Sequence, residues 1–134
     1  MNSDVISKTD LALDEVLQRP DLNGVYRLSQ AGLDFKPALD GHDLLDKQAF
    51  LAAIGRVFNF PEYYGENWDA LEECLSDMSW HTGPIALLID HADAIPASVM
   101  STFLDIFTST AEYWTEQEQA CSLFLSGLED ADIE

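Results

Sequence analysis

The segment GPIALLID, residues 83–90, is apolar on both of the faces that a β-strand presents. Such a strand is expected where helices cover both sides of a sheet or where the strand lies at the sheet centre. A second apolar run, CSLFLSGL at residues 121–128, is predicted to be the last strand. Because these strands alternate with helical patterns along the chain, we expect an α/β layer fold.

Four segments have apolar residues at the spacing of an amphipathic helix. They begin, in order, behind Thr9 or Asp10, behind Asp46, behind Asn67 and at Pro96. Asp and Asn side chains in this position accept hydrogen bonds from the backbone N–H groups of the first turn, and the fixed φ of proline suits the first helical residue. The helix behind Asn67 is expected to end near Asp77. Its apolar side consists of Trp68, Leu71, Cys74, Leu75 and Met78.

Two segments in the first third of the chain are predicted to form a β-hairpin. They are residues 24–28 (GVYRL) and residues 35–39 (FKPAL), with a short polar connection between them. Because proline has no backbone N–H, Pro37 would confine the second segment to an edge of the sheet.

The charge of the chain is strongly negative and unevenly distributed. Asp and Glu number 25 against six Lys and Arg, which gives a formal net charge of −19. The 78 residues from Val57 onward contain 16 of these acids and no Lys or Arg. Nucleic acids and anionic membranes require a cationic protein surface, so both are excluded as partners. The expected partner of such a field is a cationic protein.

The sequence contains no strong indication of export from the cytoplasm or of a metal site. No apolar run approaches the roughly 18 residues of a membrane-spanning helix, and the N-terminal residues MNSDVISKTD lack the features of a signal peptide, so we expect a cytoplasmic protein. In that compartment Cys74 and Cys121 are expected to be free, buried thiols. The three histidines are not spaced like a set of zinc ligands, and no metal or cofactor is predicted.

The segment PEYYGENWDALEECL, residues 61–75, holds five carboxylates and no basic residue. On a helix capped by Asn67, the positions i, i+3, i+4 and i+7 fall on one face opposite the apolar side. Those positions are Asp69, Glu72, Glu73 and Ser76. Rigid aromatic residues beside fixed charges are typical of a binding surface, and Tyr63, Tyr64 and Gly65 directly precede this helix. The alternative is that the acidic face is merely solvated and that the tyrosines pack on the core.

The same segment resembles the signature of the barstar family, intracellular inhibitors of secreted bacterial ribonucleases. The Pro, the Tyr-Tyr-Gly run, the Asn cap and the following Asp-Ala-Leu all fall in register, and weaker similarity extends over roughly residues 35–128. The resemblance implies a small three-stranded parallel sheet packed with helices. Residues 35–134 would form this domain, and residues 1–34 would be an N-terminal extension, a helix plus a possible extra edge strand, packed on it.

The resemblance also implies a role for each matching residue. Tyr63 resembles the aromatic residue that packs on a catalytic histidine of the ribonuclease, and Gly65 and Asn67 resemble residues that shape the loop. Asp69 resembles a carboxylate that faces an arginine. Two residues depart from the family pattern: Glu73 stands where the central phosphate-mimicking aspartate is expected, and Glu72 stands where a tryptophan is common.

We therefore predict a ribonuclease inhibitor or immunity protein (an antitoxin) that blocks the basic active-site cleft in a 1:1 complex, with no catalytic residues and no cofactor. One alternative is an acidic mimic that binds a basic protein other than a nuclease. A second alternative is a metal-dependent hydrolase that uses Asp90, His91 and Asp93, which follow a predicted buried strand at the edge where α/β proteins bind ligands. Against the hydrolase, the chain has no Gly-rich phosphate loop and no cation near these residues.

Overall fold

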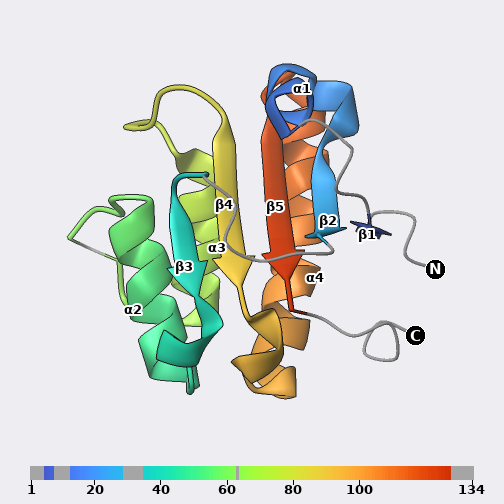
Figure 1. Cartoon of the computed structure of the whole chain (residues 1–134). Helices are drawn as coiled ribbons and strands as arrows, with labels where there is room; N and C mark the ends of the chain where they lie inside the picture. The colour runs from blue at the N-terminus through green and yellow to red at the C-terminus, as the bar shows by residue number, and fades with distance from the viewer. Residues whose placement is uncertain (1–4, 8–12, 29–34, 63, 128–134) are drawn as a thin grey trace.

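The computed structural model describes residues 5–7, 13–28, 35–62 and 64–127, with side chains described from residue 15 onward. These residues contain one five-stranded sheet in the order β1-β2-β5-β4-β3, and every neighbouring pair is parallel (Figure 1). The strands are β1 (Val5–Ser7), β2 (Gly24–Leu28), β3 (Ala38–Asp40), β4 (Ile85–Asp90) and β5 (Cys121–Ser126).

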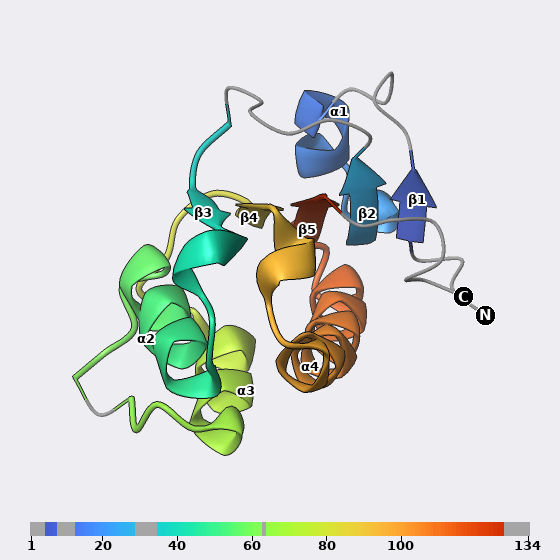
Figure 2. The same cartoon turned by 60° about the horizontal axis from the view of Figure 1, so that its bottom comes forward.

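Helices cover both faces of the sheet. The α-helices are α1 (Leu13–Gln18), α2 (Lys47–Val57), α3 (Trp68–Asp77) and α4 (Ala97–Glu116), and the short 3-10 turns are η1 (Pro20–Leu22), η2 (Gly41–Asp43) and η3 (Ala92–Ala94). Figure 2 shows α2, α3 and α4 together on one face, whereas α1 lies on the other. None of the helices in the described part of the chain is both long enough and apolar enough to cross a bilayer.

The predicted α/β class with a parallel sheet is confirmed. The three expected strands are β3, β4 and β5, and the N-terminal residues add β2 and the edge strand β1. The segment 83–90 contains β4, whose first five residues are buried, and all six residues of β5 are buried. Two adjacent strands with no exposed face therefore form the centre of the fold.

The predicted hairpin of residues 24–28 and 35–39 is wrong. Strand β2 pairs with β5, and β3 pairs with β4 on the other side of the sheet, so the two segments are not neighbours. The reason is that Tyr26 and Leu28 are buried against Phe124 of β5, an interior environment that an edge hairpin does not provide. The edge position predicted for the segment around Pro37 is confirmed, because β3 is an edge strand.

The core consists of two clusters separated by the sheet. The larger one fills the space between the sheet and helices α2, α3 and α4, and its aromatic centre is the edge-to-face pair Phe50 and Phe103, whose ring centroids lie 4.8 Å apart. The smaller cluster lies on the α1 side of the sheet. It consists of Val16, Tyr26, Leu28, Leu88 and Phe124.

The predicted helix starts are confirmed where the structure describes them. Asp46 Oδ1 accepts a hydrogen bond from the Ala49 N–H at 2.8 Å and caps α2, as its position in the sequence predicts. Pro96 occupies the capping position of α4 rather than its first turn. The proposed caps of α1, Thr9 and Asp10, lie outside the described residues. Both cysteines are free and buried, as predicted.

Candidate functional site

Helix α3 has one buried side and one charged side. Asn67 Oδ1 accepts a hydrogen bond from the Ala70 N–H at 2.8 Å, so the predicted N-cap is confirmed. Leu71 and Leu75 are completely buried. On the opposite side Asp69, Glu72 and Glu73 are exposed and Ser76 is half-buried. We call these four residues the acidic face of α3.

The carboxylates of the acidic face have no basic partner among the described residues, because no ion pair involves Asp69, Glu72 or Glu73. Carboxylates three and four residues apart on a helix repel one another, and only Asp69, in the first turn, gains from the helix dipole. The arrangement therefore does not stabilise the helix. It leaves negative charge available for a cationic partner.

Hydrogen bonds to main-chain carbonyl groups hold α3 in place from two directions. Trp114 of α4 donates its indole N–H to the Leu75 carbonyl at 2.8 Å. Trp80, just after the helix, donates to the Phe58 carbonyl at the end of α2, also at 2.8 Å. These bonds and the buried leucines make α3 a rigid platform for its charges.

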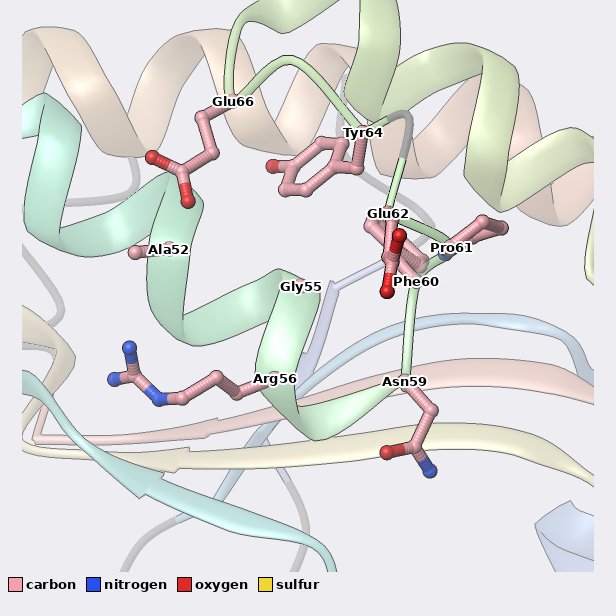
Figure 3. A pocket seen from close by; sticks show the side chains of 9 residues that line it. All are labelled: Ala52, Gly55, Arg56, Asn59, Phe60, Pro61, Glu62, Tyr64 and Glu66. Atoms are coloured by element: carbon pink, nitrogen blue, oxygen red, sulfur yellow. The ribbon is translucent and has the colours of Figure 1, made fainter.

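Tyr64 points inward and supports the loop between α2 and α3 (Figure 3). Its hydroxyl donates to the Leu51 carbonyl at 2.9 Å, and its ring packs edge-on against Phe60 at 4.8 Å between centroids. Burial raises the pKa of Tyr64 well above its ordinary value, and the charge of Glu66 adds to the shift. The Tyr64 hydroxyl is therefore a structural anchor. The neighbouring Tyr63 lies outside the described residues.

Among the described residues of the turn before α3, one has a positive φ. The residue in the left-handed region is Glu66, with φ of 54°, and not Gly65. A Cβ added to Gly65 would meet only the Asn67 Nδ2 atom within 4 Å, at 3.2 Å. Gly65 is exposed, so the space beside it is open to another chain.

A groove of about 400 Å³ lies between α2 and this loop (Figure 3). Arg56 from α2 and Glu62 and Glu66 from the loop line it, so it presents one cation and two anions. No local sequence pattern places Arg56 near the loop, so this groove could not be predicted from the sequence. Asp77, an exposed carboxylate four residues after Glu73, was not among the predicted site residues. The i+4 spacing would have indicated Asp77.

We expect Gly55→Ala to destabilise the fold through Tyr64. An added Cβ would lie 2.7 and 2.9 Å from two carbon atoms of the Tyr64 ring, which is held by its own hydrogen bond and cannot move freely. Overpacking of this kind costs about 1–3 kcal/mol. Chemical denaturation should show that loss in the wild-type background. In a Tyr64→Ala background the clash is absent, and Gly55→Ala should instead stabilise by about 0.5–1 kcal/mol through helix propensity. Destabilisation in both backgrounds would contradict the packing argument.

The residues of the alternative hydrolase site, Asp90, His91 and Asp93, do not converge. Asp90 Oδ1 accepts a hydrogen bond from Ser126 Oγ at 2.6 Å, whereas His91 Nδ1 lies 3.2 Å from Asp40 Oδ1. Asp93 is an exposed residue in the first turn of η3. Among the described residues, the one group of His, Cys, Asp or Glu side chains close enough to share an ion does not include Asp90 or Asp93, so these three side chains do not form one site.

Comparison with known proteins places the chain in a family. No curated protein matches its sequence significantly. The family model Barstar, described as barstar (barnase inhibitor), matches residues 36–126. This range includes β3, β4 and β5 with helices α2, α3 and α4, and it leaves β1, α1 and β2 outside. The chain therefore belongs to the barstar family, the barnase inhibitors.

Proposed function

We propose that this protein inhibits a ribonuclease by placing the acidic face of α3 and the preceding loop in the active-site cleft of the enzyme. Members of its family are inhibitors that bind ribonucleases such as barnase. The observation that carries the proposal is the set of exposed carboxylates on α3, which have no basic partner among the described residues and stand on a rigidly held helix. Binding of this kind would be 1:1 and would need no cofactor.

The chemistry of a ribonuclease cleft supports this proposal. The cleft must stabilise the negative charge of a phosphate in the transition state, so cationic groups line it. A preformed row of carboxylates matches those cations in charge and can occupy the place of the RNA phosphates. An immunity protein in the cytoplasm must bind the nuclease before the nuclease reaches cellular RNA. Fast electrostatic association would serve this purpose.

Most residues of the proposed contact would have a specific role. Asp69 and Glu73 would face the basic groups of the cleft, and Tyr63 would pack on a catalytic histidine. Gly65 and Asn67 would shape the loop, with Tyr64 supporting it from behind. Glu72 replaces the tryptophan that is common in the family, and Glu73 is one methylene longer than the usual aspartate. We infer that the cleft of the cognate nuclease is wider and more basic at these two positions.

The N-terminal extension would take no part in this contact. We propose that residues 35–134 form the inhibitory domain and that residues 1–34 form an extension packed on it. Support comes from Figure 2, in which α1 lies on the face of the sheet opposite α3. Val16 of α1 is buried in the smaller core cluster, on that face.

The direct test is capture of a nuclease. The purified chain, immobilised, should retain a basic protein from culture medium or lysate, and the eluted protein should have ribonuclease activity that one equivalent of the free chain abolishes. A captured basic protein without nuclease activity would instead favour an acidic mimic of a different target. An eluted nuclease that the free chain does not inhibit would refute the cleft-blocking mechanism.

Association with the nuclease should be strongly dependent on salt. The segment from Val57 onward carries 16 acids and no Lys or Arg, so its field attracts a basic partner over distances longer than contact. Such long-range attraction is screened beyond about 8 Å at physiological ionic strength. Stopped-flow measurements should therefore give an association rate that falls steeply between low and high salt, with a much smaller change in the dissociation rate. An association rate that does not change with salt would exclude electrostatic steering.

A further inference from the structure

A second polar cluster, separate from the acidic face of α3, lies at the carboxyl ends of β3 and β4. Asp40, the last residue of β3, is the ladder partner of Asp90, the last residue of β4. The turns that follow, η2 and η3, contact each other and carry His42 and the adjacent His91. They can be followed below the arrowheads of β3 and β4 in Figure 1. Ligand sites in open α/β sheets commonly form at this edge.

Three side chains converge there. His42 Nδ1 and His91 Nδ1 each lie 3.2 Å from Asp40 Oδ1. The two imidazole rings stack with centroids 4.5 Å apart and planes at 27°. The potential ligand atoms of the three residues all lie within 4.8 Å of one another. Among the described residues, this is the one group of three or more His, Cys, Asp or Glu side chains with that geometry.

The backbone of both turns is shaped to bring the histidines together. A Cβ on Gly41 would lie 2.0 Å from the His91 carbonyl oxygen, so η2 can reach η3 only with glycine at this position. His91 itself has φ of 56° and ψ of 45°, a left-handed conformation that non-glycine residues rarely adopt. Asp40 Oδ1 also accepts the His42 backbone N–H at 2.9 Å, which fixes the orientation of the carboxylate.

Two of the three ligand-to-ligand distances match a tetrahedral metal ion, and the third, between the two imidazoles, is at most 4.8 Å. Zinc binds imidazole nitrogen and carboxylate oxygen at about 2.0–2.2 Å, so two ligand atoms on a tetrahedron around it lie roughly 3.3–3.5 Å apart. Both nitrogen-to-oxygen distances to Asp40 are 3.2 Å, close to that edge length. The side chains are about half exposed, at 62% for His42, 47% for Asp40 and 44% for His91, so an ion can enter and keep water as its remaining ligand.

We propose that Asp40, His42 and His91 form a binding site for a divalent transition-metal ion of the zinc type. Two imidazoles and one carboxylate favour Zn²⁺, Ni²⁺ and Cu²⁺ over Mg²⁺ and Ca²⁺, which prefer sites made of oxygen ligands. The nearby carboxylates of Asp43 and Asp93, one in each turn, add negative charge that attracts a cation. The ion would connect the ends of β3 and β4, and thereby the edge strand to the sheet centre.

The test uses the full chain, freed of metal with a chelator, and Zn²⁺ as the probe. Isothermal titration calorimetry should show one Zn²⁺ bound per chain, and Zn²⁺ should raise the thermal unfolding midpoint, because an ion that binds only the folded state stabilises it. Mg²⁺ at the same concentration should do neither. Co²⁺ in place of Zn²⁺ should give the intense visible absorption of a tetrahedral site.

Two conservative variants and a matched control locate the site. Asp40→Asn keeps an oxygen that can accept the His42 N–H, and His91→Asn keeps a residue type that tolerates the left-handed region. Each should weaken Zn²⁺ binding by at least about tenfold, since loss of even an outer partner of a metal ligand has that effect. His81→Asn, which alters the third histidine between α3 and β4, should bind Zn²⁺ like the wild type.

Three results would overturn the proposal: no Zn²⁺ binding by the wild type, equal binding by Asp40→Asn and His91→Asn, or equal responses to Mg²⁺ and Zn²⁺. The last two would mean that the acidic surface binds cations without a specific site. None of these results bears on ribonuclease inhibition, which is measured separately and does not depend on this site.

Discussion

Glu73→Ala should weaken binding of the cognate ribonuclease by about thirtyfold to a few thousandfold and leave the stability of the fold nearly unchanged. Glu73 is exposed in the middle of α3, between Asp69 and Ser76, and its carboxylate reaches one methylene further than an aspartate. Truncating one side of a desolvated charge pair costs about 2–5 kcal/mol, a range whose supporting measurements include the barnase–barstar complex. Each 1.4 kcal/mol corresponds to a factor of about ten in affinity.

Control variants distinguish direct contact with the nuclease from a general effect of the net charge. Glu112→Ala removes an exposed carboxylate from α4 and changes the net charge equally, so it should reduce the association rate slightly and leave the dissociation rate unchanged. Glu73→Gln keeps the size of the side chain and should lose nearly as much affinity as Glu73→Ala. Glu73→Asp should weaken the cognate complex but improve any trace inhibition of a ribonuclease that pairs with the usual family aspartate. If Glu73→Ala binds as tightly as the wild type, the acidic face is merely solvated.

The sequence predicts the parts of this fold that depend on local chemistry. Asp46 and Asn67 cap their helices as expected, because an N-cap needs only its own first turn. Within the segment 83–90, residues 85–89 are buried in a strand because their apolar pattern leaves no face for water. The position of the acidic face also follows from helix periodicity alone.

What the sequence does not predict depends on contacts between distant residues. The pairing of β2 with β5 joins segments almost a hundred residues apart, and nothing in residues 24–28 identifies that partner. Tyr64 could equally have faced solvent, and its inward position depends on the absence of a Cβ at Gly55. The cluster of Asp40, His42 and His91 shows no zinc-like spacing along the chain, because two strands bring its members together.

The N-terminal extension, although it lies outside the family match, should be essential for stability. Strand β2 occupies the edge of β5 over five residues, from Gly24 opposite Ser122 to Leu28 opposite Ser126. Asn23, just before β2, connects three elements: its side-chain oxygen accepts the Cys121 N–H at 2.8 Å, and its amide donates to the Gln119 carbonyl at 2.8 Å and to Thr115 Oγ1 at 3.1 Å.

Phe124 is the residue whose burial depends most on this extension. It is completely buried, stacks on Tyr26 with centroids 5.6 Å apart, and meets Phe35 edge-on at 5.4 Å. Without residues 1–34 the smaller core cluster loses Val16, Tyr26 and Leu28 and exposes Phe124 and Leu88. Each fully buried side chain of this size contributes about 1.5–3 kcal/mol, so the sum is comparable with the whole stability of a domain, about 5–15 kcal/mol. The unpaired edge of β5 would also promote aggregation.

A chain that begins at Phe35 should therefore be largely unfolded or aggregated, although it contains every residue of the family match and of the proposed ribonuclease contact. Phe124→Ala in the full chain disturbs the same core cluster less severely and should lower the free energy of unfolding by about 3–5 kcal/mol. Circular dichroism during urea denaturation measures both effects, and Phe124→Leu should lose much less stability than Phe124→Ala.

If the shortened chain unfolds at the same urea concentration as the full chain, the sheet is stable with three strands, and the contacts of Asn23 and Phe124 contribute little. The shortened chain could instead be destabilised as expected and regain its fold when a nuclease binds. In that case the extension stabilises the inhibitor without contacting the enzyme, because binding of the nuclease to the folded state compensates by mass action for the missing core.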